Sequence, residues 1–238
     1  MIFKKNIRNE IAGIGILLAV AIGVIFYRFV DIPHNLHFDE VEFAQLALSL
    51  EKHGYIPYSP DATGHATLYF YILLASLKTW GINTFALRLP SAVFGVINAL
   101  LFYSILKFIW KKEKIGWHLA FSGALMFITS RWYFNFARFS FEPTFLLFLE
   151  FCSILTILIY GKRKQPFFLI ASGVFAGLAY NSYTPGRFFC TDSASFLDQR
   201  HRLQTIFPMF KIGKTNSSLF YSVYSCYFAT HALSQFPS

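Results

Sequence analysis

Residues 11–30 read IAGIGILLAVAIGVIFYRFV, and this stretch decides the fold class. A run of this length and apolarity spans a bilayer as one helix, because about 20 helical residues cover the hydrocarbon core. Three basic residues precede it, and the positive-inside rule then predicts a cytoplasmic N-terminus. No small-residue cleavage site follows the run, so we interpret it as a retained first span rather than a signal peptide.

The composition of the whole chain agrees with a membrane protein. Of 238 residues, 55% are hydrophobic and 20% are aromatic, and the mean hydropathy is +0.47. The formal charge of +9 comes largely from short basic loops, which is a topology signal and not a nucleic-acid-binding stripe. We therefore predict an all-α, polytopic transmembrane helical bundle that has the lipid bilayer, and no nucleic acid, as a partner.

Four later runs are long and apolar enough to be spans, at residues 89–110, 115–134, 143–160 and 167–183. Residues 66–80 are shorter and ambiguous. If they do not cross, the lysine-rich loops 111–114 and 161–164 both lie in the cytoplasm, as the positive-inside rule requires. We therefore expect residues 66–80 to form an interfacial helix on the outer face.

The sequence HNLHFDE, residues 34–40, follows the first span and places two carboxylates beside the membrane. Asp39 followed by Glu42 resembles a helix capping box, so Asp39 has a capping interpretation as well as a catalytic one. The side chains of His34, His37 and Asp39 are also weak candidate ligands for a divalent metal.

Under this topology, several charged residues share the outer face. Singly, each has an ordinary interpretation, such as an interfacial anchor or a helix-start acid. Together they predict a charged cavity against the bilayer. The residues are Asp39, Glu40, His65, Arg88, Arg138, Glu142 and Arg187.

Residues 190–238 differ from the rest of the chain. Eight of these residues are serines, against eleven in the first 189, and no run is long enough to span. We expect residues 1–189 to form the transmembrane region and 190–238 to be an atypical polar tail, disordered or produced by a shift of reading frame. A genuine soluble tail is the alternative.

Five segments, in order, carry a resemblance to a known family. They are HFDEVEFAQLALSL (37–50), GHATLYFYILLASLKTWG (64–81), ALRLPSAVFGVINALLFYSIL (86–106), ARFSFEPTFLLFL (137–149) and GLAYNSYTPGRFF (177–189). The chain resembles the N-terminal part of membrane glycosyltransferases of the C-type fold, which include dolichyl-phosphate-mannose protein mannosyltransferases and the aminoarabinose transferase of lipid A. It departs from them at Ala66-Thr67, where relatives often have two prolines.

The resemblance implies transfer of a sugar, with inversion, from a polyprenyl-phosphate donor to an acceptor outside the membrane. It implies Asp39 as the base, with Glu40 as its substitute, and Glu142 as a second acid. Arg138 and Arg187 would bind the phosphate, and His65 and Tyr183 would also contact substrate. No cofactor is certain, a divalent metal being the open alternative.

The sugar, the lipid carrier and the acceptor, whether protein, lipid or glycan, stay open. The family usually has about twice as many spans, so we expect these 238 residues alone to be inactive. We expect the cell membrane of a prokaryote as the location. A transporter and a non-catalytic scaffold are the alternative classes.

Overall fold

The computed structural model describes residues 2–52, 54–59, 65–111, 113 and 115–189. Within these ranges the chain is helical and contains no strand, which confirms the all-α prediction. The helices are α1 (Ile2–Phe26), α2 (Phe38–Ser49), η1 (Leu50–Lys52), α3 (Leu68–Trp80), α4 (Thr84–Ile109), α5 (Gly116–Thr129), α6 (Arg131–Arg138), α7 (Glu142–Arg163) and α8 (Pro166–Tyr180).

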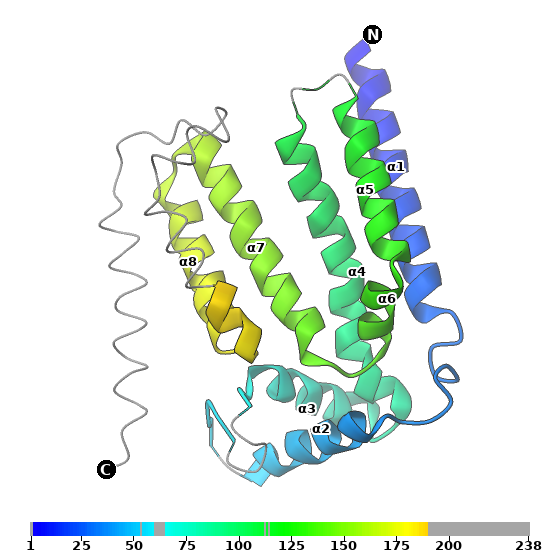
Figure 1. The fold of residues 1–238 in the computed structure, drawn as a ribbon, viewed down its shortest axis with the longest axis vertical. Coiled ribbons are helices and arrows are strands. Elements are labelled where there is room, and N and C mark those ends of the chain that lie inside the picture. Colours follow the sequence, from blue (N-terminus) through cyan, green and yellow to red (C-terminus); the bar gives the residue numbers. More distant parts are fainter. Residues whose placement is uncertain (1, 53, 60–64, 112, 114, 190–238) are drawn as a thin grey trace.

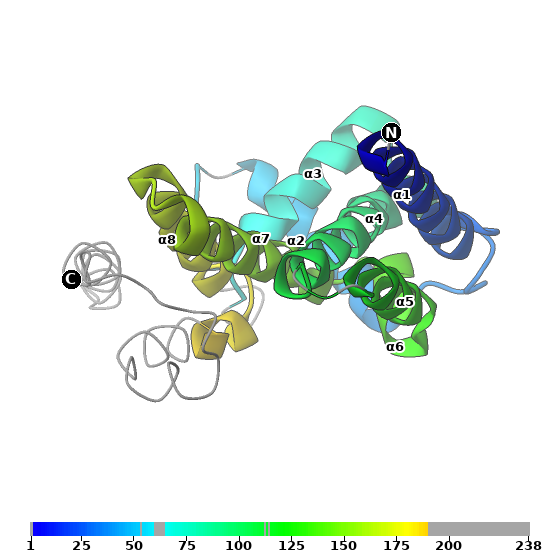
Figure 2. The same cartoon turned by 90° about the horizontal axis from the view of Figure 1, so that it is seen from above.

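The long helices α1, α4, α5, α7 and α8 stand side by side, while α2 and α3 lie across one end of the bundle (Figure 1). Seen from above, α4 and α7 occupy the middle, with α8 on one side and α1 and α5 on the other (Figure 2). The most extensive packing joins α7 to α8 and α4 to α7. We call the end that carries α2, α3 and α6 the capped end.

Two described helices, α4 and α7, are long and apolar enough to cross a membrane. Three shorter apolar helices accompany them, at Glu10–Phe26, Gly116–Thr129 and Pro166–Tyr180. Exposed apolar side chains such as Met126 and Phe167 cover the outside of the bundle, as lipid contact requires. The arrangement is a membrane helical bundle.

The sequence predicted one span over residues 115–134, but the structure divides this stretch. The backbone of Ser130 is extended, so α5 ends at Thr129 and a new helix, α6, begins at Arg131. A helix that continued along the membrane would carry Arg131, Asn135 and Arg138 into hydrocarbon, which is costly. The break places these polar residues at the capped end instead.

Candidate functional site at the capped end of the bundle

Asp39 lies in the first turn of α2, where the helix begins at Phe38 after the extended residue His37. Its side chain is 52% exposed, and Oδ2 lies 3.6 Å from His37 Nδ1. A carboxylate in this turn interacts favourably with the positive end of the helix dipole. The side chain remains open to solvent, so it is accessible to a substrate.

Glu40, and not Asp39, closes the start of this helix. The backbone N–H of His37 donates to Glu40 Oε2 at 3.0 Å. The capping interpretation of Asp39 was therefore wrong, because the helix starts two residues earlier than a cap at Asp39 would require. The glutamate three residues after the cap position accepts the hydrogen bond, as in a capping box.

Glu40 is buried and faces a buried arginine from α4. Arg88 Nε donates to Glu40 Oε1 at 2.8 Å, and Arg88 Nη2 donates to Glu40 Oε2 at 3.0 Å. The N–H of Ser140 also donates to Oε1, at 3.1 Å. Both oxygens of Glu40 thus have partners, and the bidentate ion pair fixes α2 against α4 and the segment before α7.

Arg138 binds backbone carbonyl groups at the end of α1. Its guanidinium donates to the carbonyl oxygens of Val24 at 3.1 Å, Tyr27 at 2.7 Å and Ile32 at 2.9 Å. The last carbonyls of a helix have no partner within the helix, and a cation there also complements the dipole. The structure therefore gives Arg138 an anchoring role, and its predicted phosphate contact stays a prediction.

Glu142 and His65 are predicted site residues that lie in direct contact. Glu142 Oε1 lies 3.0 Å from His65 Nδ1, although 77 residues separate the two in sequence. The Glu142 side chain is 1% exposed and belongs to the first turn of α7, and that of His65 is 35% exposed. Within the described part of the chain, the second carboxylate oxygen, Oε2, is buried without a hydrogen-bond partner.

The hydrogen bond that His65 donates to the Glu142 carboxylate raises the pKa of His65 above its ordinary value, although partial burial acts in the opposite direction. A neighbouring carboxylate favours the protonated imidazole. The contact therefore favours a proton on His65, beside a buried carboxylate oxygen that has no hydrogen-bond partner among the described residues.

Aromatic rings surround this pair. The Tyr183 ring stacks on His65 with centroids 6.5 Å apart, and Phe43 lies 6.3 Å from His65. Phe43 also stacks on Phe141, at 6.0 Å. Since Phe43 is one turn beyond Asp39 on α2, these contacts bring α2 and the start of α7 to the same region.

Arg187 lies in a helical turn, residues 184–189, that follows Tyr183. Its guanidinium lies over the Tyr58 ring at 5.6 Å and over the Tyr180 ring at 5.8 Å. The Tyr58 hydroxyl donates to Asn181 Oδ1 at 3.1 Å. This cluster joins the loop before α3 to the end of α8 on the same side of the bundle.

The candidate metal ligands do not converge. Among the described residues, no three side chains of His, Cys, Asp or Glu are grouped as a metal site. His37 approaches Asp39, while His34 lies exposed in the preceding loop.

Sequence reasoning missed a polar network behind the pair. The buried Tyr69 hydroxyl lies 2.7 Å from Ser91 Oγ and 3.3 Å from Ser140 Oγ. Ser91 Oγ also accepts the N–H of Phe141, at 3.1 Å. Burial raises the pKa of Tyr69 to about 12, so the hydroxyl stays neutral and acts as a structural tie. The sequence signal for this network was the recurrence of a polar residue every few positions in otherwise apolar helices.

Residues 64–208 match the family model described as dolichyl-phosphate-mannose-protein mannosyltransferase. The match covers about three-fifths of the chain and includes His65, Glu142, Tyr183 and Arg187. It extends past residue 189, into residues that lie outside the described part. No curated protein and no solved structure gave a significant match. The chain therefore belongs to the dolichyl-phosphate-mannose-protein mannosyltransferase family of membrane glycosyltransferases, as the resemblance of its motifs indicated.

Proposed function

We propose that the capped end carries out sugar transfer from a polyprenyl-phosphate donor to an acceptor on the outer side of the membrane. The observation that carries the proposal is the placement of two unlike carboxylates. Asp39 is exposed, and Glu142 is buried against His65 with one oxygen left for a ligand. Carboxyl groups in different environments are suited to different roles in acid–base chemistry.

In this mechanism Asp39 takes the proton of an acceptor hydroxyl as its oxygen attacks the anomeric carbon. The bond from that carbon to the phosphate oxygen breaks, and the lipid phosphate leaves with the electron pair. Inversion follows, because attack and departure occur on opposite faces. Glu40 keeps a positioning role in this proposal, since its oxygens are occupied by Arg88 and backbone N–H groups.

Glu142 and His65 would orient the acceptor, and Arg187 would bind the leaving phosphate. An arginine provides two parallel N–H donors that match phosphate oxygens. Support for Arg187 is its place next to Tyr183, which stacks on His65. Arg138 is the less suitable phosphate ligand, because its guanidinium already binds the carbonyls that end α1.

The test uses the 238-residue chain in bilayer nanodiscs with a radiolabelled polyprenyl-phosphate hexose. We expect the wild-type chain to retain the donor, and Arg187→Gln to weaken retention about tenfold, as loss of a charged hydrogen-bonding group predicts. In any preparation in which wild type transfers sugar, Asp39→Asn should bind donor normally and lose that transfer. Donor binding without transfer would support the proposed donor site. It would also agree with the expected inactivity of this chain.

Two results would overturn the proposal. One is the absence of donor binding by the wild-type chain when a circular-dichroism spectrum shows that it is folded. The other is measurable transfer by wild type that Asp39→Asn retains to within about twofold, since a general base contributes at least about a hundredfold.

A further inference from the structure

A cavity of about 280 Å³ lies along α7, separate from the His65–Glu142 pair. Pro143, Leu146, Leu147 and Glu150 of α7 line it. These positions follow the spacing i, i+3, i+4, i+7, so they form one face of the helix. This face of α7 therefore borders unfilled space along two turns.

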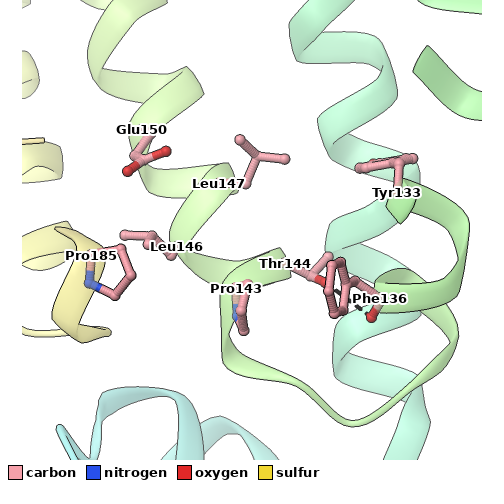
Figure 3. Close-up of a pocket in the computed structure, with 8 residues that line it drawn as sticks. All are labelled: Tyr133, Phe136, Pro143, Thr144, Leu146, Leu147, Glu150 and Pro185. Atoms are coloured by element: carbon pink, nitrogen blue, oxygen red, sulfur yellow. Dashed lines mark hydrogen bonds between the residues drawn. The ribbon is translucent and has the colours of Figure 1, made fainter. Parts of the chain in front are cut away.

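Thr144 of α7, two aromatic residues of α6 and a proline complete the lining. Tyr133 and Phe136 flank α7 on one side and Pro185 lies on the other (Figure 3). The Tyr133 hydroxyl donates to the carbonyl of Gly95, so its polar atom is already used within the bundle. The cavity thus offers leucine side chains, two aromatic rings, a threonine whose hydroxyl already donates to the carbonyl of Phe136, and a single carboxylate.

Glu150 is the unusual member of this group. It lies about 10 Å along the axis from Pro143, inside a helix long enough to cross a membrane. Its carboxylate has neither a hydrogen bond nor an ion pair among the described residues. A carboxylate in hydrocarbon is costly unless it is paired, so ionisable residues at such depth usually have a partner.

The cavity selects the chemistry of that partner. A carboxylate attracts a cation and repels a phosphate, which excludes the phosphate of a lipid-linked donor. An ammonium ion forms charge-assisted hydrogen bonds with a carboxylate. The volume lies near the lower limit of about 300 Å³ for small-ligand pockets, which suits one chain and not a two-chain lipid.

We propose that this cavity binds a single-chain amphiphile with a protonated amine. The ammonium group pairs with Glu150, and the alkyl chain packs on Leu146 and Leu147. This binding is independent of sugar transfer, so it is measured without any assay of activity.

The test compares dodecylammonium with dodecyl sulfate in nanodiscs of neutral lipid, by native mass spectrometry against empty nanodiscs. We expect the wild-type chain to prefer dodecylammonium by about tenfold. Non-specific attraction to a chain of charge +9 would give the opposite preference, because sulfate is the anion. Glu150→Gln should remove the preference, and Leu147→Trp should fill the cavity and remove binding.

Met126→Trp is the matched control, because Met126 is 73% exposed on α5 and away from the cavity. It should bind dodecylammonium as wild type does. Equal binding of both amphiphiles by wild type, or an unchanged preference in Glu150→Gln, would overturn the proposal. So would wild-type binding by Leu147→Trp, a result that remains informative even if Glu150→Gln fails to fold.

Discussion

Arg88 and Glu40 form a fully enclosed ion pair, with Nε 2.8 Å from Oε1, although 48 residues separate them. Their side chains are 0% and 2% exposed. Arg88 also donates to the carbonyl oxygens of Pro33, at 3.2 Å, and Asn35, at 3.4 Å. One guanidinium therefore holds both the loop that leads to Asp39 and the helix that carries it.

We predict that Arg88→Met destabilises the fold by about 3–5 kcal/mol, because it leaves the buried Glu40 carboxylate without its counterion. The double variant Glu40→Met, Arg88→Met should recover most of this loss. Thermal unfolding in detergent, followed by circular dichroism, measures both. Lys78→Met is the control: its pair with Glu51 is about half exposed and worth less than about 1 kcal/mol. A small effect of Arg88→Met would contradict the assigned role.

Arg138→Met should destabilise the protein by about 1–3 kcal/mol, because several carbonyl oxygens at the end of α1 lose their donor. Arg131→Met, at an exposed position of the same helix, is the matched control and should have little effect. Urea unfolding of the two purified variants gives the comparison. If Arg138→Met instead weakens only donor binding at unchanged stability, the phosphate-binding prediction for Arg138 would gain support.

The His65–Glu142 contact predicts a dependence of stability on pH. The folded-state pKa of His65 is raised above the ordinary value of 6.5. The contact therefore stabilises fully below that value, and its contribution disappears as pH rises through the higher folded-state pKa. The melting temperature of wild type minus that of His65→Gln, measured from about pH 5.5 to about pH 9, should fall with pH.

His34→Gln provides the control for this series, because His34 is an exposed loop residue outside the pair. Its melting temperature should follow that of wild type at every pH. If the difference in melting temperature between wild type and His65→Gln stays constant with pH, or rises, the contact with Glu142 does not favour the protonated imidazole of His65.

Gly95 of α4 packs directly against α6. A Cβ at this position would lie 2.6 Å from the Ala137 Cβ and 3.1 Å from Ile25 Cδ1. Gly95→Ala should therefore destabilise by about 1–3 kcal/mol through overpacking. Gly23→Ala is the matched control, since a Cβ there meets nothing within 4 Å, and it should be neutral or slightly stabilising. Equal melting temperatures for the two variants would mean that the helices separate without cost.

Much of the helical plan could be predicted from the pattern of residues. The positions of α4, α7 and α8 agree with the predicted spans to within a few residues. The division at Ser130 could not be predicted, because α5 and α6 are both rich in apolar and aromatic residues. Only the three-dimensional path of the chain separates them. The sides of the membrane that the two ends face stay a prediction.

The candidate site was predictable as a set of residues, but not as a set of contacts. Glu142 and His65 were both selected, yet nothing in their spacing indicated that they touch. Glu40 and Arg138 looked equally available to substrate in the sequence. In the structure, Arg88 binds the Glu40 carboxylate. The Arg138 guanidinium binds carbonyl groups at the end of α1.

The sequence by itself determined the class of this protein, because hydrophobic length and basic loops are local properties that a bilayer reads segment by segment. It also determined the family, through motifs that keep their order along the chain. Only the tertiary structure decided which charges are free to do chemistry. The buried ion pair joins residues 48 positions apart in the sequence, and the carboxylate–histidine contact joins residues 77 positions apart. Both contacts depend on how the helices pack, and no local periodicity encodes that packing.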